Sequence, residues 1–303
     1  MDVADPRPHD AIARVRSFNR TVTERIGALD EGYLARGRPL GQSRLLWEIG
    51  ATGGDGAELR ALRERLDLDS GYLSRQLRAL EGDGLIRVEP SAADSRVRVA
   101  QLTAEGVAER AELDRSSDAL VGDILDPLTE RQQERLLAAM GEVERLMTAS
   151  AVEVRAVDPS DPAARASVAA YFAELAARFD VGFDPGHTRP TPDDEFREPQ
   201  GTFLVAFLHG EPVGCVGLKL HGDEPAEIKR LWVAAGTRGM GLGGRLLREV
   251  EAAAVRLGVR VVRLDTNRSL TEAIAMYRSH GYDEISDFNG EPYADFWFEK
   301  RLA

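Results

Sequence analysis

A glycine-rich stretch near position 240 has the composition of an anion-binding loop. Glycines stand at 239, 241, 243 and 244, directly after Arg238 and before a predicted helix over residues 244–257. A helix N-terminus offers unpaired N–H groups and a positive dipole end to phosphate, and glycines let the backbone curl around it without Cβ clashes. The stretch has neither the Lys-[Ser/Thr] of a nucleotide P-loop nor the spacing of a G-x-G-x-x-G fingerprint.

The arrangement instead resembles the GNAT acetyltransferases. Their signature [Gln/Arg]-x-x-Gly-x-[Gly/Ala] is met by Arg238, Gly241 and Gly243, and segments 264–267 and 273–282 match the second half of the family pattern. The resemblance covers about residues 152–302. It implies acetyl-CoA as co-substrate and no metal. The residues that it implies to hold the acetyl, pantetheine and pyrophosphate parts are Leu231, Trp232, Val233, Arg238, Gly239, Met240, Gly241, Leu242, Gly243, Gly244 and Asn267.

Acetylation of an amine needs a general base, a hydrogen-bond donor for the oxyanion and a general acid. The amine must lose a proton before it attacks, the tetrahedral oxyanion needs a donor, and the leaving thiolate needs a proton. Tyr277 stands where the GNAT family keeps its thiolate-protonating tyrosine, and Glu227 stands where some members have the general base. A backbone N–H near Val233 is the expected oxyanion donor.

Each of these candidates also has a structural interpretation. Tyr277 fits a core aromatic of an amphipathic helix, and Glu227 fits a surface charge on an edge strand. His280 suits a helix C-terminus, where the dipole favours it, and Cys215 suits a small buried apolar position. The acidic runs 193–195 and 223–224 fit solvated loops, or loops that attract a cationic amine.

A second functional pattern lies in residues 57–102, which follow the order helix, turn, helix, strand, loop, strand. This is the order of a winged helix-turn-helix. Leu73, Leu77 and Leu80 share one helix face and are expected to pack inward, and the loop 90–95 would form the wing. The residues expected to face DNA are Ser70, Tyr72, Ser74, Arg75, Arg78 and Arg96.

This half resembles the MarR family of transcription regulators. The matching stretches appear in family order and cover most of residues 10–148; they are 45–49, 66–75, 80–86, 94–96 and 102–106. The resemblance implies a homodimer built from the terminal helices of this domain, with paired recognition helices on a palindromic double-stranded operator. The alternative is that Arg75 and Arg78 form only a solvated helix face. Because the domain is not strongly basic, we expect modest, salt-sensitive binding.

The two halves of the chain, which carry these two patterns, differ in the spacing of their apolar residues. Before residue 150 the apolar spacing predicts mostly helix, over 11–36, 42–49, 57–66, 70–81, 103–121 and 129–147, with strands at 85–88 and 97–102. After residue 151 strands alternate with helices. The strands are expected at 152–157, 203–208, 213–220, 228–233, 259–264, 284–285 and 294–300, and the helices at 163–179, 244–257 and 271–279. A proline-rich loop spans 184–201.

A length of 303 residues and the change of pattern near Ser150 predict two domains. The expected architecture is a helix-rich winged helix over residues 1–150, then an α/β GNAT acyltransferase fold over residues 151–303 with a mixed, mostly antiparallel sheet. The net charge of −12 argues against a generally cationic nucleic-acid binder, although the stretch 60–98 reverses the trend. The single cysteine excludes an internal disulfide, and the five histidines lie too far apart for a metal site.

No apolar run approaches the ~20 residues of a membrane span, and the first residues lack a signal-peptide pattern, so we expect a cytoplasmic protein. Three functions stay open. The first is a MarR-type regulator that is also an active N-acetyltransferase on a primary amine of a small molecule or a protein lysine. The second is a regulator whose acyl-CoA domain only senses metabolites. The third is an acetyltransferase whose helical half has lost specific DNA recognition.

Overall fold

The computed structural model describes residues 9–29, 32–53, 56–180, 182–188, 192–222 and 224–302. Asp223 of the acidic run, Pro190 of the proline-rich loop, and Gly54 and Asp55 of the expected break after the second helix lie outside these ranges. The chain divides into two compact units, Met1–Leu137 and Ala138–Ala303. Within the described ranges, no helix is both long and apolar enough to cross a membrane.

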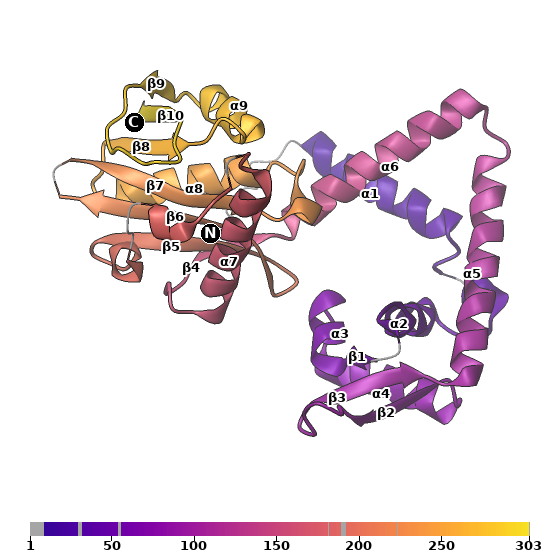
Figure 1. Cartoon of the computed structure of the whole chain (residues 1–303). Coiled ribbons are helices and arrows are strands. Elements are labelled where there is room, and N and C mark those ends of the chain that lie inside the picture. The colour runs from indigo at the N-terminus through magenta and orange to yellow at the C-terminus, as the bar shows by residue number, and fades with distance from the viewer. Residues whose placement is uncertain are drawn as a thin grey trace, which may run out of the picture. The chain divides into compact units, whose positions relative to one another are not determined.

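The first unit is mainly helical and carries one small sheet (Figure 1). Its elements are α1 (His9–Arg25), η1 (Tyr33–Ala35), α2 (Leu40–Ala51), β1 (Ala57–Glu58), α3 (Leu59–Arg65), α4 (Ser70–Gly82), β2 (Ile86–Pro90), β3 (Arg98–Leu102), α5 (Ala104–Leu125) and the start of α6 (Glu130–Ser150). The sheet is antiparallel with strand order β1-β3-β2. Helices α3 and α4 with the β2–β3 hairpin form the expected winged helix-turn-helix.

Two side chains define the start of the helices that flank the hairpin. Asp69 is the N-cap of α4 and accepts a hydrogen bond from the Tyr72 N–H at 3.0 Å. Thr103 caps α5 by accepting from the Gly106 N–H, and its hydroxyl donates to the Gly84 carbonyl. Both caps satisfy N–H groups that a helix start leaves unpaired, which confirms the helix starts predicted there.

The first helix is shorter than its apolar spacing predicted. A helix over 11–36 was expected, but α1 ends at Arg25 and a turn follows it. Gly27 adopts φ 63° and Gly37 φ 69°, and these left-handed conformations do not fit a continuous helix. The apolar repeat persists past Arg25 because Leu34 packs against the core of the unit from the separate turn η1.

The core of the first unit is a leucine-rich cluster formed by its helices and its small sheet. The side chains expected to point inward from α4, Leu73, Leu77 and Leu80, are each at most 5% exposed. Glu48 of α2 is also buried, and it is paired with Arg44 at 2.5 Å and with Arg65 of α3 at 2.8 Å. This carboxylate therefore joins α2 to α3, the helix that precedes α4.

The second unit is built on a seven-stranded sheet with the order β4-β5-β6-β7-β8-β10-β9. All neighbouring strands are antiparallel except β7 and β8, so the sheet is mixed and mostly antiparallel as expected. Its elements are β4 (Glu153–Ala156), α7 (Pro162–Arg178), η3 (Pro185–His187), η4 (Asp193–Phe196), β5 (Gly201–Leu208), β6 (Glu211–His221), β7 (Glu224–Val233), η5 (Ala235–Thr237), α8 (Leu242–Arg256), β8 (Val261–Thr266), α9 (Thr271–Ser279), β9 (Asp283–Ile285) and β10 (Phe296–Arg301).

Helices α7 and α8 cover opposite faces of the sheet (Figure 1). Alternate residues of a strand point to opposite faces. On β5, Phe203 and Val205 belong to the apolar cluster that includes Ala164 of α7, whereas Leu204 and Ala206 belong to the cluster built around α8. Both faces of the central strands are therefore buried, which explains their near-continuous apolar sequence.

Replacing Glu109 of α5 by Gln should destabilise the first unit by roughly 1–2 kcal/mol. Its carboxylate bonds to Arg36 at 2.5 Å and lies 3.4 Å from Arg38, so it ties the segment before α2 to α5. The hydrogen bond from Arg36 lowers the pKa of Glu109, so its contribution is present above about pH 4.5 and is lost as the pH falls further. Urea unfolding at pH 7 and pH 3.5 measures both effects.

The matched control is Glu64→Gln, which removes the largely exposed pair with Arg60 of the same unit. We expect it to change the unfolding free energy by less than about 0.5 kcal/mol. Equal losses in both variants at pH 7, or a loss in Glu109→Gln that persists undiminished at pH 3.5, would contradict this account.

Candidate functional site

The site lies where two parallel strands separate. β7 and β8 pair only at Ala226 with Val262 and at Glu227 with Arg263. Beyond these pairs β7 has a bulge opposite β6. Cys215 pairs with Trp232 and Gly217 pairs with Lys229, so two residues of β7 stand opposite one residue of β6. Bulges bend a strand and end regular pairing. The backbone of β7 after Lys229 is therefore free of β8, and two cavities occupy this region of the unit.

The larger cavity has a volume of about 570 Å³. It is bounded by the end of β7, the end of α7, the glycine-rich loop and three residues of α9, which are Glu272, Ala273 and Met276. Most of the residues predicted to hold acetyl-CoA line it; they are Leu231, Trp232, Val233, Arg238, Gly239, Gly241, Leu242, Gly243 and Gly244. Met240 and Asn267 are not part of this lining, and Asn267 lines the smaller cavity instead.

The N-terminus of α8 faces this cavity with its first amides uncapped. Gly241 is the N-cap residue with φ 74°, and no side chain accepts from the amides that follow. Gly239 has a similar φ of 77°, and a Cβ at either position would meet no other atom. These two glycines are thus needed for backbone conformation, and the exposed amides with the Arg238 guanidinium suit a diphosphate.

Gly243 and Gly244, which also line the larger cavity, are needed for packing as well. A Cβ on Gly243 would lie 3.1 Å from Met276 Sδ, and one on Gly244 would lie 2.8 Å from His280 Nε2. They allow α9 to pack closely against the start of α8. His280 is fixed there by a contact of 2.9 Å between Nδ1 and the Met276 carbonyl, so it serves helix packing.

Glu174 of α7 joins the groups around the larger cavity. Its Oε2 accepts from Trp232 Nε1 at 2.9 Å and from the Arg238 guanidinium, and its Oε1 lies 3.3 Å from Arg178. Arg238 also donates from Nε to the Val233 carbonyl at 3.2 Å. This carboxylate therefore orients the cation beside the α8 N-terminus and fixes the indole of β7.

The smaller cavity has a volume of about 340 Å³ and adjoins the larger one. Both are lined by Tyr171, Leu175, Leu231, Leu270 and Ala273, which therefore form the boundary between them. Of these two cavities, the smaller is the one that Tyr277 of α9 lines.

That residue, Tyr277, fits both of its sequence interpretations. Its ring packs against Tyr282 and Phe298 with centroids 5.8 Å apart, and it is 6% exposed. It also lines the smaller cavity, next to Ala273 of the same helix. Burial raises the pKa of the Tyr277 phenol well above its ordinary value of 10, and the negative charge of Asp265 acts in the same direction. The phenol is therefore uncharged at physiological pH.

A group of buried charges crosses the gap between β7 and β8. Lys229 Nζ lies 2.5 Å from Asp265 Oδ1 and 3.7 Å from Glu227 Oε2, and Glu227 lies 3.6 Å from His221 Nε2. The Asn289 amide also donates to Asp265. Glu227 is thus on an interior strand, not on an edge strand, and it lines neither cavity; Lys229 and Asp265 are the members of this group that do.

The acidic run 193–195 is paired with cations and is not a freely solvated loop. Arg197 binds Asp194, Lys219 binds Glu195 at 2.8 Å, and Arg230 Nη1 lies 3.8 Å from Asp193. Cys215 is buried as expected, and its thiol donates to the Arg230 carbonyl at the bulge. Burial raises the pKa of Cys215 to about 12, so the thiol is not a nucleophile at neutral pH.

In the first unit, α4 presents the predicted polar face. Ser70, Arg75 and Arg78 are exposed, and Tyr72 and Ser74 are half-buried. The Tyr72 hydroxyl lies so close to Gly41 that a Cβ there would be 2.6 Å from it, so this tyrosine also packs against α2.

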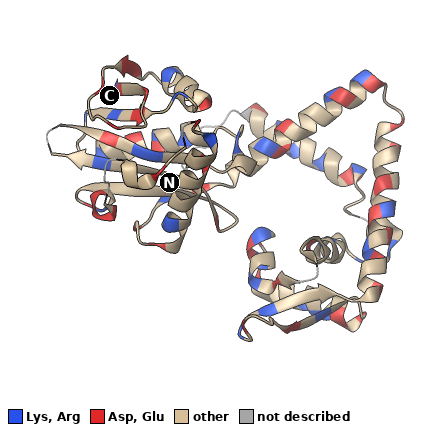
Figure 2. Cartoon of the chain, in the orientation of Figure 1, with Lys and Arg blue, Asp and Glu red and all other residues tan. Residues whose placement is uncertain are grey.

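The wing arginine is held by a neighbour that sequence analysis did not single out. Asp94 accepts from Arg96 Nη2 at 2.8 Å and Nε at 3.1 Å, while the guanidinium stays 89% exposed. Figure 2 shows basic residues, which are all arginines in this unit, on α3 and at the tip of the β2–β3 hairpin. The winged helix therefore carries exposed cations although the chain as a whole is acidic.

Sequence reasoning missed Tyr171, Glu174, Lys229 and Asp265. The first two lie on a helix with no motif of its own, and the last two become neighbours only through the pairing of β7 with β8. Asp265 was quoted only as part of a matching segment. Among the residues that the structure describes, no group of three or more His, Cys, Asp or Glu side chains is placed to hold a metal ion.

Comparison with known proteins finds two family models in this chain. The acetyltransferase (GNAT) family matches residues 169–282, and the MarR family matches residues 36–97. An uncharacterised N-acetyltransferase of Schizosaccharomyces pombe is 33% identical over 103 residues, 33% of this chain and 63% of the relative. An IAA acetyltransferase of Azospirillum brasilense is 33% identical over 97 residues, 32% of this chain and 62% of the relative.

The chain thus spans less than two thirds of the length of these two relatives. Among solved structures, an acetyltransferase of the GNAT family from Staphylococcus aureus is 18% identical, with a TM-score of 0.44, over 50% of this chain and 100% of that one.

Replacing Lys229 by Met should destabilise the second unit by about 3 kcal/mol, because two buried carboxylates lose their cation. Adding Asp265→Asn to this variant should restore part of the loss. Urea unfolding measures both, and Arg278→Met, which breaks an exposed pair with Glu284, is the control. A loss no larger than in this control would show that the buried charges are not coupled.

Proposed function

We propose that this chain, which joins a MarR-family segment to a GNAT-family acetyltransferase domain, is a DNA-binding transcription regulator that also transfers an acetyl group from acetyl-CoA to a primary amine. The observation that carries the enzymatic half is the junction of the two cavities at Leu231 and Ala273. One cavity ends at uncapped helix amides and an arginine, and the other contains a buried phenol. Such a pair of sites fits a diphosphate-bearing thioester on one side and its acceptor on the other.

Acetyl-CoA fits the larger cavity by charge and shape. Its pyrophosphate would accept from the amides of residues 241–244 and from Arg238, which Glu174 already orients. Its pantetheine arm would run beside the backbone of Leu231–Val233, which β8 leaves unpaired. The thioester would then lie at the junction of the cavities, within reach of both the acceptor amine and Tyr277.

In the transfer, the amine nitrogen attacks the thioester carbonyl, the C–N bond forms, and the C–S bond breaks as the tetrahedral intermediate collapses. A backbone N–H near Val233 would donate to the oxyanion. Tyr277, kept neutral by burial, would give its proton to the departing thiolate. Glu227 is the proton acceptor that the family resemblance implies, and since it lies behind Lys229 it would act through that ion pair or a water molecule. The acceptor is a small-molecule amine or a protein lysine.

The DNA-binding half rests on the face of α4 and on the wing. Arg75 and Arg78 are exposed on one side of the helix, and Arg96 is held extended by Asp94. Arginine can bond both acceptors of a guanine in the major groove, and a wing arginine can enter a minor groove. We therefore assign α4 to the major groove, with Ser70, Tyr72 and Ser74 on phosphates.

A homodimer on a palindromic operator is supported by the exposed apolar side chains of the terminal helices. On α1, Val15, Phe18 and Val22 recur every three or four residues and are 37–59% exposed. On α6, Leu137 and Met140 are also more than half exposed. Repeated exposed apolar residues on one helix face indicate a partner surface.

Tyr277→Phe should lower kcat for thiol release from acetyl-CoA about 100-fold, because the thiolate loses its proton donor. Acetyl-CoA affinity by calorimetry should not change. Since burial raises the pKa of Tyr277, the wild-type rate should show no alkaline loss from this group below about pH 10.

The control for Tyr277→Phe is Tyr282→Phe, which removes the hydroxyl of a neighbouring core ring that lines neither cavity. Equal rates in the two variants would reject Tyr277 as the proton donor. Tight acetyl-CoA binding without turnover on any amine would instead identify the domain as a sensor.

Arg75→Ala should weaken binding to the selected operator by about 1–3 kcal/mol if the side chain reads a base pair. Arg115→Ala, an exposed arginine of α5 outside the winged helix, is the control. Fluorescence anisotropy at two salt concentrations measures both variants. Equal affinities of the two variants for operator DNA would favour an acetyltransferase that has lost specific recognition.

A further inference from the structure

We propose that the smaller cavity takes a primary amine with an aromatic group, its ammonium bound by Asp265 and its ring lying against Phe179, Phe183 and Tyr293. This assignment rests on the proposed acyl transfer, in which this cavity is the acceptor side, and names the chemical class of the acceptor. Neither the family matches nor the relatives' names assign a ligand to these residues.

The lining of the smaller cavity is unusually aromatic for this chain. Aromatic residues make up 6% of the sequence, yet six of them line this one cavity. They are Tyr171, Phe172, Phe179, Phe183, Tyr277 and Tyr293. A wall of this kind favours a flat apolar group, since ring stacking adds to the burial of apolar area.

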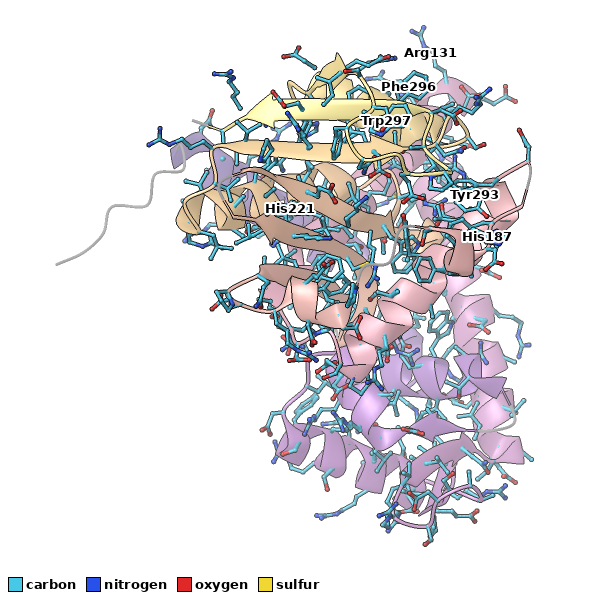
Figure 3. All side chains as sticks on the ribbon, turned by 60° about the vertical axis from the view of Figure 1, so that its left-hand side comes forward. Arg131, His187, His221, Tyr293, Phe296 and Trp297 are labelled. Carbon is cyan, nitrogen blue, oxygen red and sulfur yellow. The ribbon has the colours of Figure 1, made fainter. Side chains whose placement is uncertain are left out.

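Four of these rings form one connected group, in which the other three contact Phe183. Phe172 stacks on Phe183 with centroids 5.6 Å apart, Phe183 contacts Phe179 edge-on at 5.6 Å, and Tyr293 lies 5.1 Å from Phe183. Tyr293 is fixed by its hydroxyl, which accepts from the Asp184 N–H. Figure 3 shows Tyr293 at the same edge of the domain as His187, so the aromatic wall lies where the loop after α7 approaches the segment before β10.

The opposite wall supplies the charge that an ammonium group needs. Asp265 lines the cavity, and its carboxylate accepts from Lys229 and from Asn289, both at Oδ1. Among the described residues no hydrogen bond goes to Oδ2, and this oxygen would accept from the ligand. Burial, and after it the negative charge of Asp265, raises the pKa values of Tyr171 and Tyr277, so this carboxylate acts on two of the phenols that line the cavity with it.

The two walls thus define an orientation for the acceptor. The ammonium end lies near Asp265, Leu231 and Tyr277, where the thioester would arrive, and the ring points toward Phe183 and Tyr293. Asp265 would hold the ammonium in place, and the proton that its nitrogen must lose before attack would go to Glu227, the acceptor proposed above, through the Lys229 ion pair or a water molecule. A volume of about 340 Å³ holds a single-ring amine with a short linker.

The test is calorimetric binding of 2-phenylethylamine, n-propylamine and 2-phenylethanol to the full chain without acetyl-CoA. We expect 2-phenylethylamine to bind at least tenfold more tightly than either the amine without a ring or the alcohol without a charge. Phe183→Ala should remove the preference over n-propylamine and leave acetyl-CoA binding unchanged. Phe288→Ala, which removes a ring outside the cavity, should have no effect.

Asp265→Asn should weaken 2-phenylethylamine about tenfold and leave 2-phenylethanol unchanged, and this second ligand shows that the cavity is still folded. Equal binding of the alcohol and the amine, equal binding of the two amines, or an unchanged preference in Phe183→Ala would overturn the proposal.

Thiol release with acetyl-CoA separates this proposal from the proposed function. Aromatic amines that bind but are never acetylated would remove the enzymatic function and keep the ligand class. Acetylation confined to aliphatic amines or protein lysines would keep the enzyme and remove the ligand class.

Discussion

The separation of β7 from β8 after a single short stretch of parallel pairing is the constraint on which the site depends. Pairing stops at Glu227 and Arg263, and the bulge opposite Val216 turns the rest of β7 away. A sheet that stayed paired would bury the backbone of Leu231–Val233 in hydrogen bonds and leave no room for a ligand between the strands. The ion pair of Lys229 with Asp265 crosses the gap at its base. The early end of the β7–β8 pairing therefore creates both cavities and places a charged pair beside them.

Helix α7 gives the two cavities a common wall. Glu174 faces the cation and indole of the larger cavity, Tyr171 lies at the boundary, and Phe172 faces the smaller one. Because a diphosphate at the α8 N-terminus would share Arg238 with Glu174, α7 contacts both the proposed acceptor cavity and the arginine proposed to bind the donor. Under the proposed function, α7 is thus a physical route that couples binding at the two sites.

The sequence allowed much of this to be predicted wherever the signal was local. The caps Asp69 and Thr103, the inward leucines of α4 and the glycine-rich start of α8 all follow from short-range rules, and the structure contains them. The first helix was predicted too long, since the apolar repeat continues across a break at Gly27. Lys229 and Asp265 could not be paired from the sequence, because the register of two strands 36 residues apart decides their contact. Glu227 was predicted to be a general base from the family resemblance, with a surface charge on an edge strand as the alternative, and the pairing of its strand places it in the interior of the sheet behind Lys229.

The most direct test of this account is a crystal structure of the chain with acetyl-CoA. We predict that the pyrophosphate lies on the amides of residues 241–244, that the pantetheine arm runs along the unpaired edge of β7, and that the sulfur faces the Tyr277 phenol. Acetyl-CoA bound elsewhere, or bound here with its sulfur directed away from that phenol, would contradict it.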